Sequence, residues 1–279
     1  MRKLGPGWVM TPAVMVAIVA IIPTPVPAQW LNYPTAGVPK TANGQLNLDA
    51  PAPRTPDGKP DLSGMWQAEA GRISRPCPTK NCEELRTSDL WLDFGHDLAG
   101  GLPYQPWAAD AVKQRKLTNG KDDPTSKCLP LGVPRLLVDP EYRKIVQVPG
   151  LVVVLNERNA SFRQIFTDGR PLPDDPQPYW NGYSTGKWDG DTLVVQSTGF
   201  RDGMWLDRIG SPLTESAKVT ERFRRVNYGR LEIEVTVNYP KAYTQPWTVK
   251  VNESIVLNTE LLDYICNENE KDLKHLVGK

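Results

Sequence analysis

Val219-Thr-Glu-Arg-Phe-Arg-Arg-Val226 alternates apolar and charged residues, and Leu231-Glu-Ile-Glu-Val-Thr-Val-Asn238 does the same. A period of two is typical of a half-buried β-strand. Between the two runs, Asn227-Tyr228-Gly229 fits a three-residue hairpin loop, which would pair Val226 with Arg230 and fix the register of both strands. This stretch therefore predicts a β-hairpin with one apolar and one charged face.

The predicted register also assigns side chains to the two faces of the hairpin. Arg224 lies opposite Glu232 and Arg222 opposite Glu234 on the charged face, where each cross-strand pair adds about 0.2 to 1 kcal/mol. The other face carries Val219, Phe223, Arg225, Leu231, Ile233, Val235 and Val237.

Glu221 falls on the apolar face, opposite Val235. A buried carboxylate costs free energy unless it is paired, so two interpretations are open. The preferred one is an ion pair with Arg225, on the same face. If Glu221 instead faces a cavity, burial would raise its pKa and make it a candidate general acid or base.

Strand-like runs separated by turn residues fill the second half of the chain. The eight runs are residues 142–148, 151–157, 161–167, 183–188, 192–198, 219–226, 231–238 and 249–257. Trp188-Asp189-Gly190-Asp191 places Asp-Gly between two of them, a strong signal for a two-residue hairpin. We predict a mainly β fold: an antiparallel meander that closes into a β-barrel or strongly curved sheet, with a β-sandwich as the alternative.

A second acid–base pair lies at the neighbouring turn Arg158-Asn159-Ala160. We expect Glu157 and Arg163 to flank this turn and to share a face with Val153, Leu155 and Ile165. Two such pairs on neighbouring hairpins predict a polar layer inside the barrel, which either fixes the strand order or contributes to a functional site.

Residues 72–130 mix short helical signals with turns, and we expect them to plug or flank the barrel. Residues 88–98 predict one or two helical turns, and residues 106–116 predict a helix with Trp107 on its apolar side. His96 lies between carboxylates in Asp93-Phe94-Gly95-His96-Asp97, which makes it a candidate acid or base. A surface position is the preferred interpretation of this histidine.

Residues 1–28 predict a cleavable secretory signal, with a basic start, a short apolar run and small residues before Gln29. The apolar run is shorter than the roughly 20 residues that span a bilayer, which disfavours a membrane anchor. Residues 29–60 predict an extended Pro-rich arm, and residues 61–279 a single β-rich domain. The mature protein is expected in the periplasm or outside the cell.

The four cysteines, Cys77, Cys82, Cys128 and Cys266, favour disulfides in an exported chain. Of the three connectivities, we favour Cys77 with Cys82 and Cys128 with Cys266. A metal site at Cys77 and Cys82 is disfavoured, because His96 and His275 are both distant in sequence. We expect no metal and no cofactor.

The charge balance and the motifs narrow the class of function. The chain has 33 basic and 32 acidic residues, so no global field attracts nucleic acid or an anionic membrane. It also lacks nucleophile, phosphate-loop, haem-attachment and paired-histidine motifs. Among its nine tryptophans, Trp180, Trp188 and Trp205 are candidates to line a site for a flat or apolar ligand.

Several motifs together resemble a family of exported, functionally uncharacterised bacterial proteins, common in acidobacteria and proteobacteria. They are Pro60-Asp-Leu-Ser-Gly-Met-Trp66, Cys128-Leu-Pro-Leu-Gly-Val-Pro-Arg135, Gly182-Tyr-Ser-Thr-Gly-Lys-Trp-Asp-Gly-Asp-Thr-Leu-Val-Val195, Thr220-Glu-Arg-Phe-Arg-Arg225 and Asp263-Tyr-Ile-Cys-Asn-Glu-Asn269. The resemblance covers nearly all the mature chain and implies one chain-long unit and the Cys128–Cys266 pairing, but no activity. Similar chains often carry a histidine after the proline of Gly210-Ser211-Pro212-Leu213-Thr214, and its replacement by Leu213 weakens an enzymatic interpretation.

Three hypotheses about function follow. The leading one is an exported β-barrel protein that binds a small apolar or aromatic ligand, with Glu221, Arg225, Glu157 and Arg163 as polar contacts. The second is an acid/base isomerase, lyase or cyclase that uses Glu221 or Glu157. The third is a structural or accessory subunit that holds a protein partner through residues 29–60.

Overall fold

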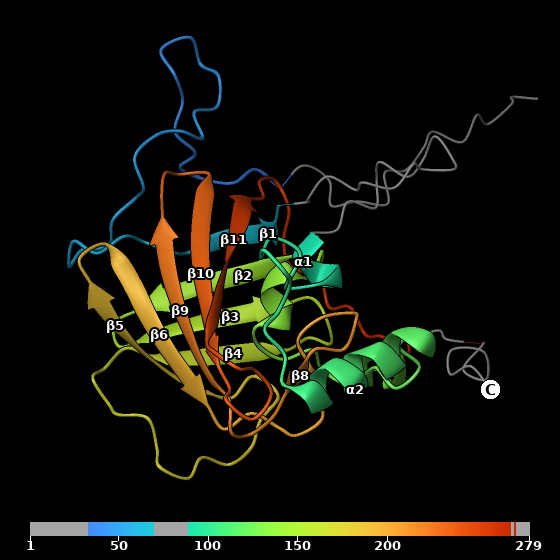
Figure 1. Ribbon diagram of the computed structural model, residues 1–279. Helices are drawn as coiled ribbons and strands as arrows, with labels where there is room; N and C mark the ends of the chain where they lie inside the picture. The colour runs from blue at the N-terminus through green and yellow to red at the C-terminus, as the bar shows by residue number, and fades with distance from the viewer. Residues whose placement is uncertain (1–32, 70–88, 269–270, 272–279) are drawn as a thin grey trace, which may run out of the picture. The chain divides into compact units, whose positions relative to one another are not determined.

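A closed β-barrel forms the core of the computed structural model, which describes residues 33–69, 89–268 and 271 (Figure 1). The strand order is β1-β11-β10-β9-β6-β5-β4-β3-β2, which confirms the barrel prediction and excludes the sandwich. The barrel strands are β1 (Gly64–Ala68), β2 (Arg143–Val148), β3 (Leu151–Asn156), β4 (Phe162–Phe166), β5 (Tyr183–Asp189), β6 (Thr192–Thr198), β9 (Lys218–Arg225), β10 (Arg230–Asn238) and β11 (Trp247–Ile255). All eight predicted runs are strands, and β1 is an additional one.

The hairpin β9–β10 has the predicted register. Val235 pairs with Glu221 and Glu232 with Arg224, and the Val226 N–H donates to the Arg230 carbonyl at 3.0 Å. In the hairpin β5–β6 the two loop residues are Gly190 and Asp191, one position later than the predicted Asp-Gly pair. Gly190 has a φ of +58°, which fits the first position of a type II′ turn.

The join between β4 and β5 departs from the predicted meander. These two strands run parallel and pair at Ile165 with Ser184 and at Phe166 with Thr185. Parallel neighbours need a crossover connection, and residues 167–182, which contain four prolines, provide it. This parallel seam is the shortest ladder in the barrel.

Side chains fill the barrel interior. The 3₁₀ helix η3 (Arg135–Val138) is buried and packs against the inner face of the strands. Arg143 anchors it by donating to the carbonyls of Leu136 at 2.8 Å and Leu137 at 2.9 Å. The cavity between η3 and the inner faces of the described strands measures about 10 Å³, which is room for about one water molecule. This cavity is too small for an apolar ligand.

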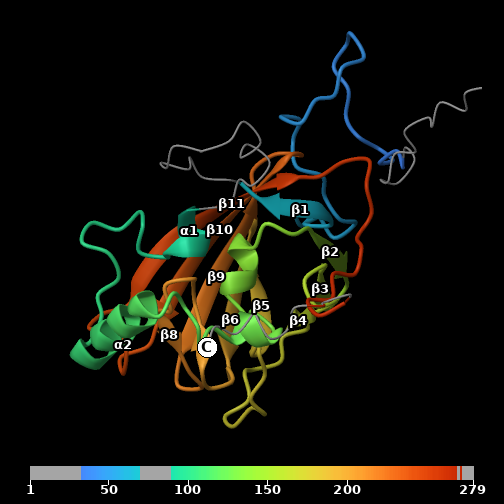
Figure 2. The same cartoon turned by 90° about the vertical axis from the view of Figure 1, so that its right-hand side faces the viewer.

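Two α-helices lie on one flank of the barrel (Figure 2). The prediction of one or two helical turns is confirmed by α1 (Asp89–Leu92), and that of a longer helix by α2 (Pro106–Leu117). The expectation that Trp107 marks the apolar side of α2 is wrong. Ala108 and Val112 are the buried residues, whereas Trp107 is 48% exposed and its indole N–H donates to the Lys241 carbonyl at 2.5 Å.

A two-stranded sheet, β7 (Met204–Trp205) with β8 (Pro212–Leu213), lies outside the barrel ladder. The fully buried carboxylate of Asp207 accepts hydrogen bonds from the backbone N–H groups of Phe94, Gly210 and Ser211. Leu213, where the resemblance predicts a histidine in similar chains, is a core residue at 1% exposure.

The described part of the predicted arm, residues 33–60, binds the chain's own barrel. Backbone hydrogen bonds of 2.8 Å join Tyr228 to Ala50 and Gly229 to Leu48, and Arg54 pairs with Asp191 at 2.6 Å. Tight turns closed by Lys40 with Leu46 and Arg54 with Pro60 fold the arm back on itself.

Cys128 and Cys266 form a disulfide with a Cα–Cα distance of 5.4 Å, as predicted. The proposed Cys77–Cys82 pair and the proposed signal segment lie outside the described residues. Among the described helices, none has the length and apolar content needed to cross a membrane.

Candidate functional site

Glu221 pairs with Arg163, across the barrel. The Arg163 Nη1 donates to Glu221 Oε1 at 2.8 Å and its Nη2 donates to Oε2, and both side chains are buried. The predicted pairing of Glu221 with Arg225 is wrong, because residues four apart on a strand are about 13 Å apart. Closure of the barrel instead brings β4 within reach of β9.

Arg225 has a structural role at the end of the barrel. Its guanidinium lies between the rings of Trp66 and Tyr228, 4.9 and 5.3 Å from their centroids. It donates to the carbonyls of Asp61 at 2.6 Å, Ser63 at 3.0 Å and Tyr228 at 2.6 Å. These contacts hold the start of β1 against the β9–β10 loop.

Glu157 does not face Arg163 as predicted. Its two oxygens accept hydrogen bonds from the N–H groups of Tyr142 and Leu262, each at 3.1 Å. The predicted face of β3 is also wrong, because Val152, Val154 and Asn156 point inward while Val153 and Leu155 are half-buried. This strand is apolar on both sides, so no alternation of polarity specifies its inner face.

Two serines that the sequence analysis missed complete the buried cluster. Arg163 donates from Nε to Ser184 Oγ at 3.1 Å and from Nη2 to Ser197 Oγ at 2.9 Å. Ser184 and Ser197 pair in the β5–β6 ladder with their hydroxyls 2.9 Å apart. The turn at Gly190 and Asp191 pairs these two serines. The predicted turn at Asp189 and Gly190, one residue earlier, would not have paired them.

A second buried ion pair lies beside this cluster. Arg143 donates to Glu253 Oε1, and both side chains are almost completely buried. Burial raises the pKa of Glu253 against the opposing charge of Arg143, and the charge of Glu221 raises it further. The predicted polar layer therefore exists, but it joins Arg163 with Glu221 and Arg143 with Glu253.

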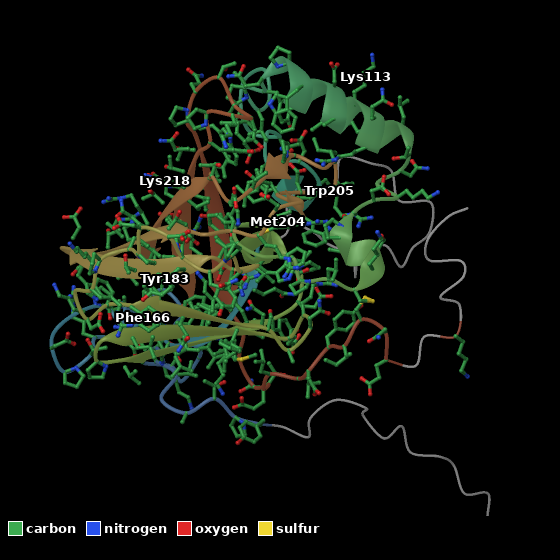
Figure 3. The ribbon with its side chains drawn as sticks, turned by 90° about the horizontal axis from the view of Figure 1, so that it is seen from below. Lys113, Phe166, Tyr183, Met204, Trp205 and Lys218 are labelled. Atoms are coloured by element: carbon green, nitrogen blue, oxygen red, sulfur yellow. A yellow bond between two sulfur atoms is a disulfide. The ribbon has the colours of Figure 1, made fainter. Side chains whose placement is uncertain are left out.

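An open cleft of about 470 Å³ lies next to Arg163, at the seam between β4 and β5. Arg163 and Ser184 form its floor. Aromatic rings dominate its walls: Phe162, Phe166, Tyr179, Trp180 and Tyr183. Figure 3 shows Phe166 and Tyr183 side by side on the neighbouring strands, and their rings stack at 5.3 Å with an interplanar angle of 28°.

Two of the five aromatic side chains that line the cleft are exposed to solvent. Phe162 is 62% and Tyr179 58% exposed. Cations cover the outer edges, since the Arg170 guanidinium lies 4.0 Å from the Phe166 ring centre and that of Arg201 lies 5.6 Å from the Trp180 ring. An exposed cluster of large apolar side chains around a concave surface is typical of a ligand site.

The floor of the cleft is electrically neutral. Arg163 is the one charged side chain among the described residues that line the cleft. The carboxylate of Glu221 neutralises its charge. Four of its N–H contacts go to Glu221 and the two serines. The guanidinium is thus already satisfied, and an anionic ligand would compete with Glu221 for it.

The other predicted site residues lie outside the cleft. Trp188 packs against the core, and Trp205 is buried beneath Arg115, 4.6 Å from the ring centre. Figure 3 places Trp205 well apart from Phe166 and Tyr183. His96 is exposed, with Nδ1 2.8 Å from Asp97. Of the three candidate tryptophans, Trp180 alone lines the cleft.

The chain matches no protein-family model, and no curated protein matches it. The resemblance to a family of exported bacterial proteins therefore stays a prediction. Within residues 33–69, 89–268 and 271, no three His, Cys, Asp or Glu side chains are arranged to hold a metal ion. The geometry of the cleft is what remains to indicate function.

Proposed function

We propose that this protein is an exported β-barrel that binds a flat, uncharged aromatic molecule in the cleft between β4 and β5. The observation that carries the proposal is the set of five aromatic side chains around the cleft, of which Phe162 and Tyr179 are exposed, above a neutral floor. The cleft volume of about 470 Å³ lies in the usual range for small-molecule sites.

Stacking explains the preference for an aromatic ligand. A flat ring inserted beside Phe162 and Tyr179 covers apolar surface that is now in contact with water. Each favourable ring pair adds roughly 0.5 to 1.5 kcal/mol beyond the buried area. The disulfide at Cys128, two residues before the lining residue Pro130, stiffens one rim and is in keeping with an oxidising compartment outside the cytoplasm.

The two carboxylates predicted as candidate acids or bases, Glu221 and Glu157, do not favour acid/base catalysis. Both oxygens of Glu221 are held by Arg163, and both oxygens of Glu157 accept backbone hydrogen bonds. A general base needs an oxygen that can approach the proton of a substrate. Binding is thus the function that this geometry supports best.

Two fluorescent probes with the same ring system test the charge preference. N-phenyl-1-naphthylamine is neutral, and 1-anilinonaphthalene-8-sulfonate carries an added sulfonate. We expect saturable binding of one neutral probe per chain and weaker binding of the anion. Tighter binding of the sulfonate would contradict the proposed neutral site, and absence of binding by both would contradict an aromatic site.

A matched pair of variants tests the location of the probe. Phe162→Ala should weaken binding of the neutral probe by roughly fivefold, because one ring contact of about 1 kcal/mol is lost. Trp107→Ala removes a similarly exposed aromatic ring on α2, outside the cleft, and should leave the affinity unchanged. Equal losses in the two variants would show that the probe binds exposed rings without using the cleft.

A further inference from the structure

Two carboxyl groups, those of Asp139 and Glu141, converge on one arginine next to the cleft. Arg158 donates from Nε to Asp139 Oδ2 and from Nη2 to Glu141 Oε1, both at 2.7 Å. The Asp139 side chain is 3% exposed, while that of Glu141 is 25% exposed. One guanidinium thus bridges two acids, which would leave a net charge of −1 if both were ionised.

The other two oxygens of these carboxyls lack a donor. Asp139 Oδ1 and Glu141 Oε2 are buried and have no hydrogen-bond partner in the described part of the chain. An ionised carboxylate can only accept, so two of them cannot satisfy each other. One proton held between Asp139 and Glu141 supplies the missing donor and removes the repulsion.

The surrounding cations are committed elsewhere. Arg143 donates to the Asp139 carbonyl at 3.0 Å, but its charge pairs with Glu253. Arg135 stacks on the Trp91 ring that Arg158 also approaches, and it pairs with Asp123 at 2.7 Å. From the C-terminal segment, the Tyr264 ring lies 5.0 Å from Arg158. Among the residues that the structure describes, Arg158 is the cation that pairs with both acids.

Arg158 connects this acid pair to the cleft. It begins the β3–β4 turn, where the N–H of Asn159 donates to the Tyr264 carbonyl at 2.6 Å. Ala160 and Ser161, the two residues after Asn159, line the cleft. A change in the position of Arg158 is thus transmitted directly to one wall of the site.

We infer that Asp139 and Glu141 share one proton, and that this proton holds Arg158 and the β3–β4 turn in the conformation that shapes the cleft. The link to binding rests on the proposed function, whereas the shared proton does not. Loss of the proton leaves two carboxylates repelling each other, and the more exposed Glu141 then turns to water and releases Arg158 Nη2.

The titration range lies near neutral pH. Burial, together with the hydrogen bond and charge of Glu141, raises the pKa of Asp139 to about 7 against the opposing charge of Arg158. Burial alone would raise the pKa of Glu141 too, but the hydrogen bond with Asp139 and the charge of Arg158 lower it below its usual value. The cleft should accordingly bind well in mildly acidic medium and less well in alkaline medium.

Infrared spectroscopy tests the shared proton without any ligand. The C=O stretch of a protonated carboxylic acid should be present at about pH 5.5 and lost at about pH 8.5, well above the usual range of an aspartate. Burial also raises the pKa values of Glu253 and Asp207, so these carboxyls contribute to the same region of the spectrum. Asp139→Asn should remove one component of the band, and Asp110→Asn, at an exposed position on α2, should leave the band unchanged. Absence of the band in the unaltered protein at about pH 5.5 overturns the inference.

Binding of N-phenyl-1-naphthylamine tests the link to the cleft. The affinity should fall by roughly fivefold between about pH 5.5 and about pH 8.5, at the low end of measured coupling between sites. Asp139→Asn and Glu141→Gln each replace the proton with an amide N–H donor, so both should retain the high affinity throughout. Asp110→Asn should keep the pH dependence.

The two measurements separate the possible failures. A titrating band with an affinity that does not change with pH overturns the link to the cleft. A titrating band with no probe binding at any pH supports the shared proton and contradicts the proposed function. Equal pH dependence in Asp139→Asn, Glu141→Gln and the unaltered protein overturns the role of the pair.

Discussion

The hairpin β9–β10 and the seam β4–β5 are both parts of one barrel, yet they are built in opposite ways. The hairpin is antiparallel and paired along the whole of both strands, from Arg225 with Leu231 to Lys218 with Asn238. The seam is parallel and pairs at two positions only. The cleft opens at the seam, between β4 and β5.

The difference arises from how strongly each segment specifies its partner. Alternation and a tight loop define the hairpin register, and its inner face is apolar apart from Glu221 and Arg225. Around the seam, apolar residues lie on both faces of β3, and aromatic residues of β4 and β5 remain in water. In this barrel the cleft lies where the ladder is shortest.

The largest expected effect comes from breaking the buried ion pair that joins these two regions. Glu221→Ala leaves Arg163 buried and unpaired, so unfolding in urea should show a loss of about 3 to 5 kcal/mol. Replacing both partners, by Glu221→Leu with Arg163→Met, should recover most of this loss. A cost below about 1 kcal/mol for the single change would show that water reaches Arg163.

The second largest loss of stability is expected from removing the disulfide. Cys128→Ser with Cys266→Ser opens a cross-link between residues 138 apart, which should cost about 2 to 4 kcal/mol in urea unfolding. Because the Asn159 side chain donates to the Cys128 carbonyl at 3.3 Å, the rim of the cleft should loosen and bind the neutral probe less tightly. Unchanged affinity would separate the cleft from this cross-link.

The pH dependence of stability should distinguish the two regions. The folded-state pKa of Asp139 is raised, so its contribution to stability is complete below about pH 4 and is lost as the pH rises to about 7. The free energy of unfolding of Asp139→Asn, measured in urea, should therefore rise relative to that of the unaltered protein by about 1 kcal/mol or more between about pH 4 and about pH 7. A constant difference would contradict the shared proton.

The smallest effect is expected on the outer face of the hairpin. Arg224 donates to Glu232 at 2.8 Å, and this hydrogen bond lowers the pKa of Glu232. Arg224→Ala should cost about 0.2 to 1 kcal/mol at neutral pH, and the cost should vanish as the pH falls through the pKa of Glu232. Stability here is lost toward acid, opposite to Asp139. A cost that persists in acid would indicate lost packing of the arginine stem.

Local patterns in the sequence were sufficient for much of the fold. Strand-like runs between turn residues identified eight strands, the loop at Asn227 specified the β9–β10 register, and the cysteines indicated the Cys128–Cys266 bond. They also identified Glu221, Arg163 and Trp180 as unusual positions. Each of these inferences depends on residues that are close in sequence or on a simple count.

Tertiary structure alone decided which of these positions meet. Alternation shows on which face of a strand a side chain lies, but not which strand is opposite once the sheet closes. That is why Glu221 was assigned to Arg225 instead of Arg163, and why Phe162, Tyr179 and Tyr183 were not recognised as one wall. Their proximity depends on the parallel crossover of β4 to β5, a long-range pairing that no local periodicity encodes.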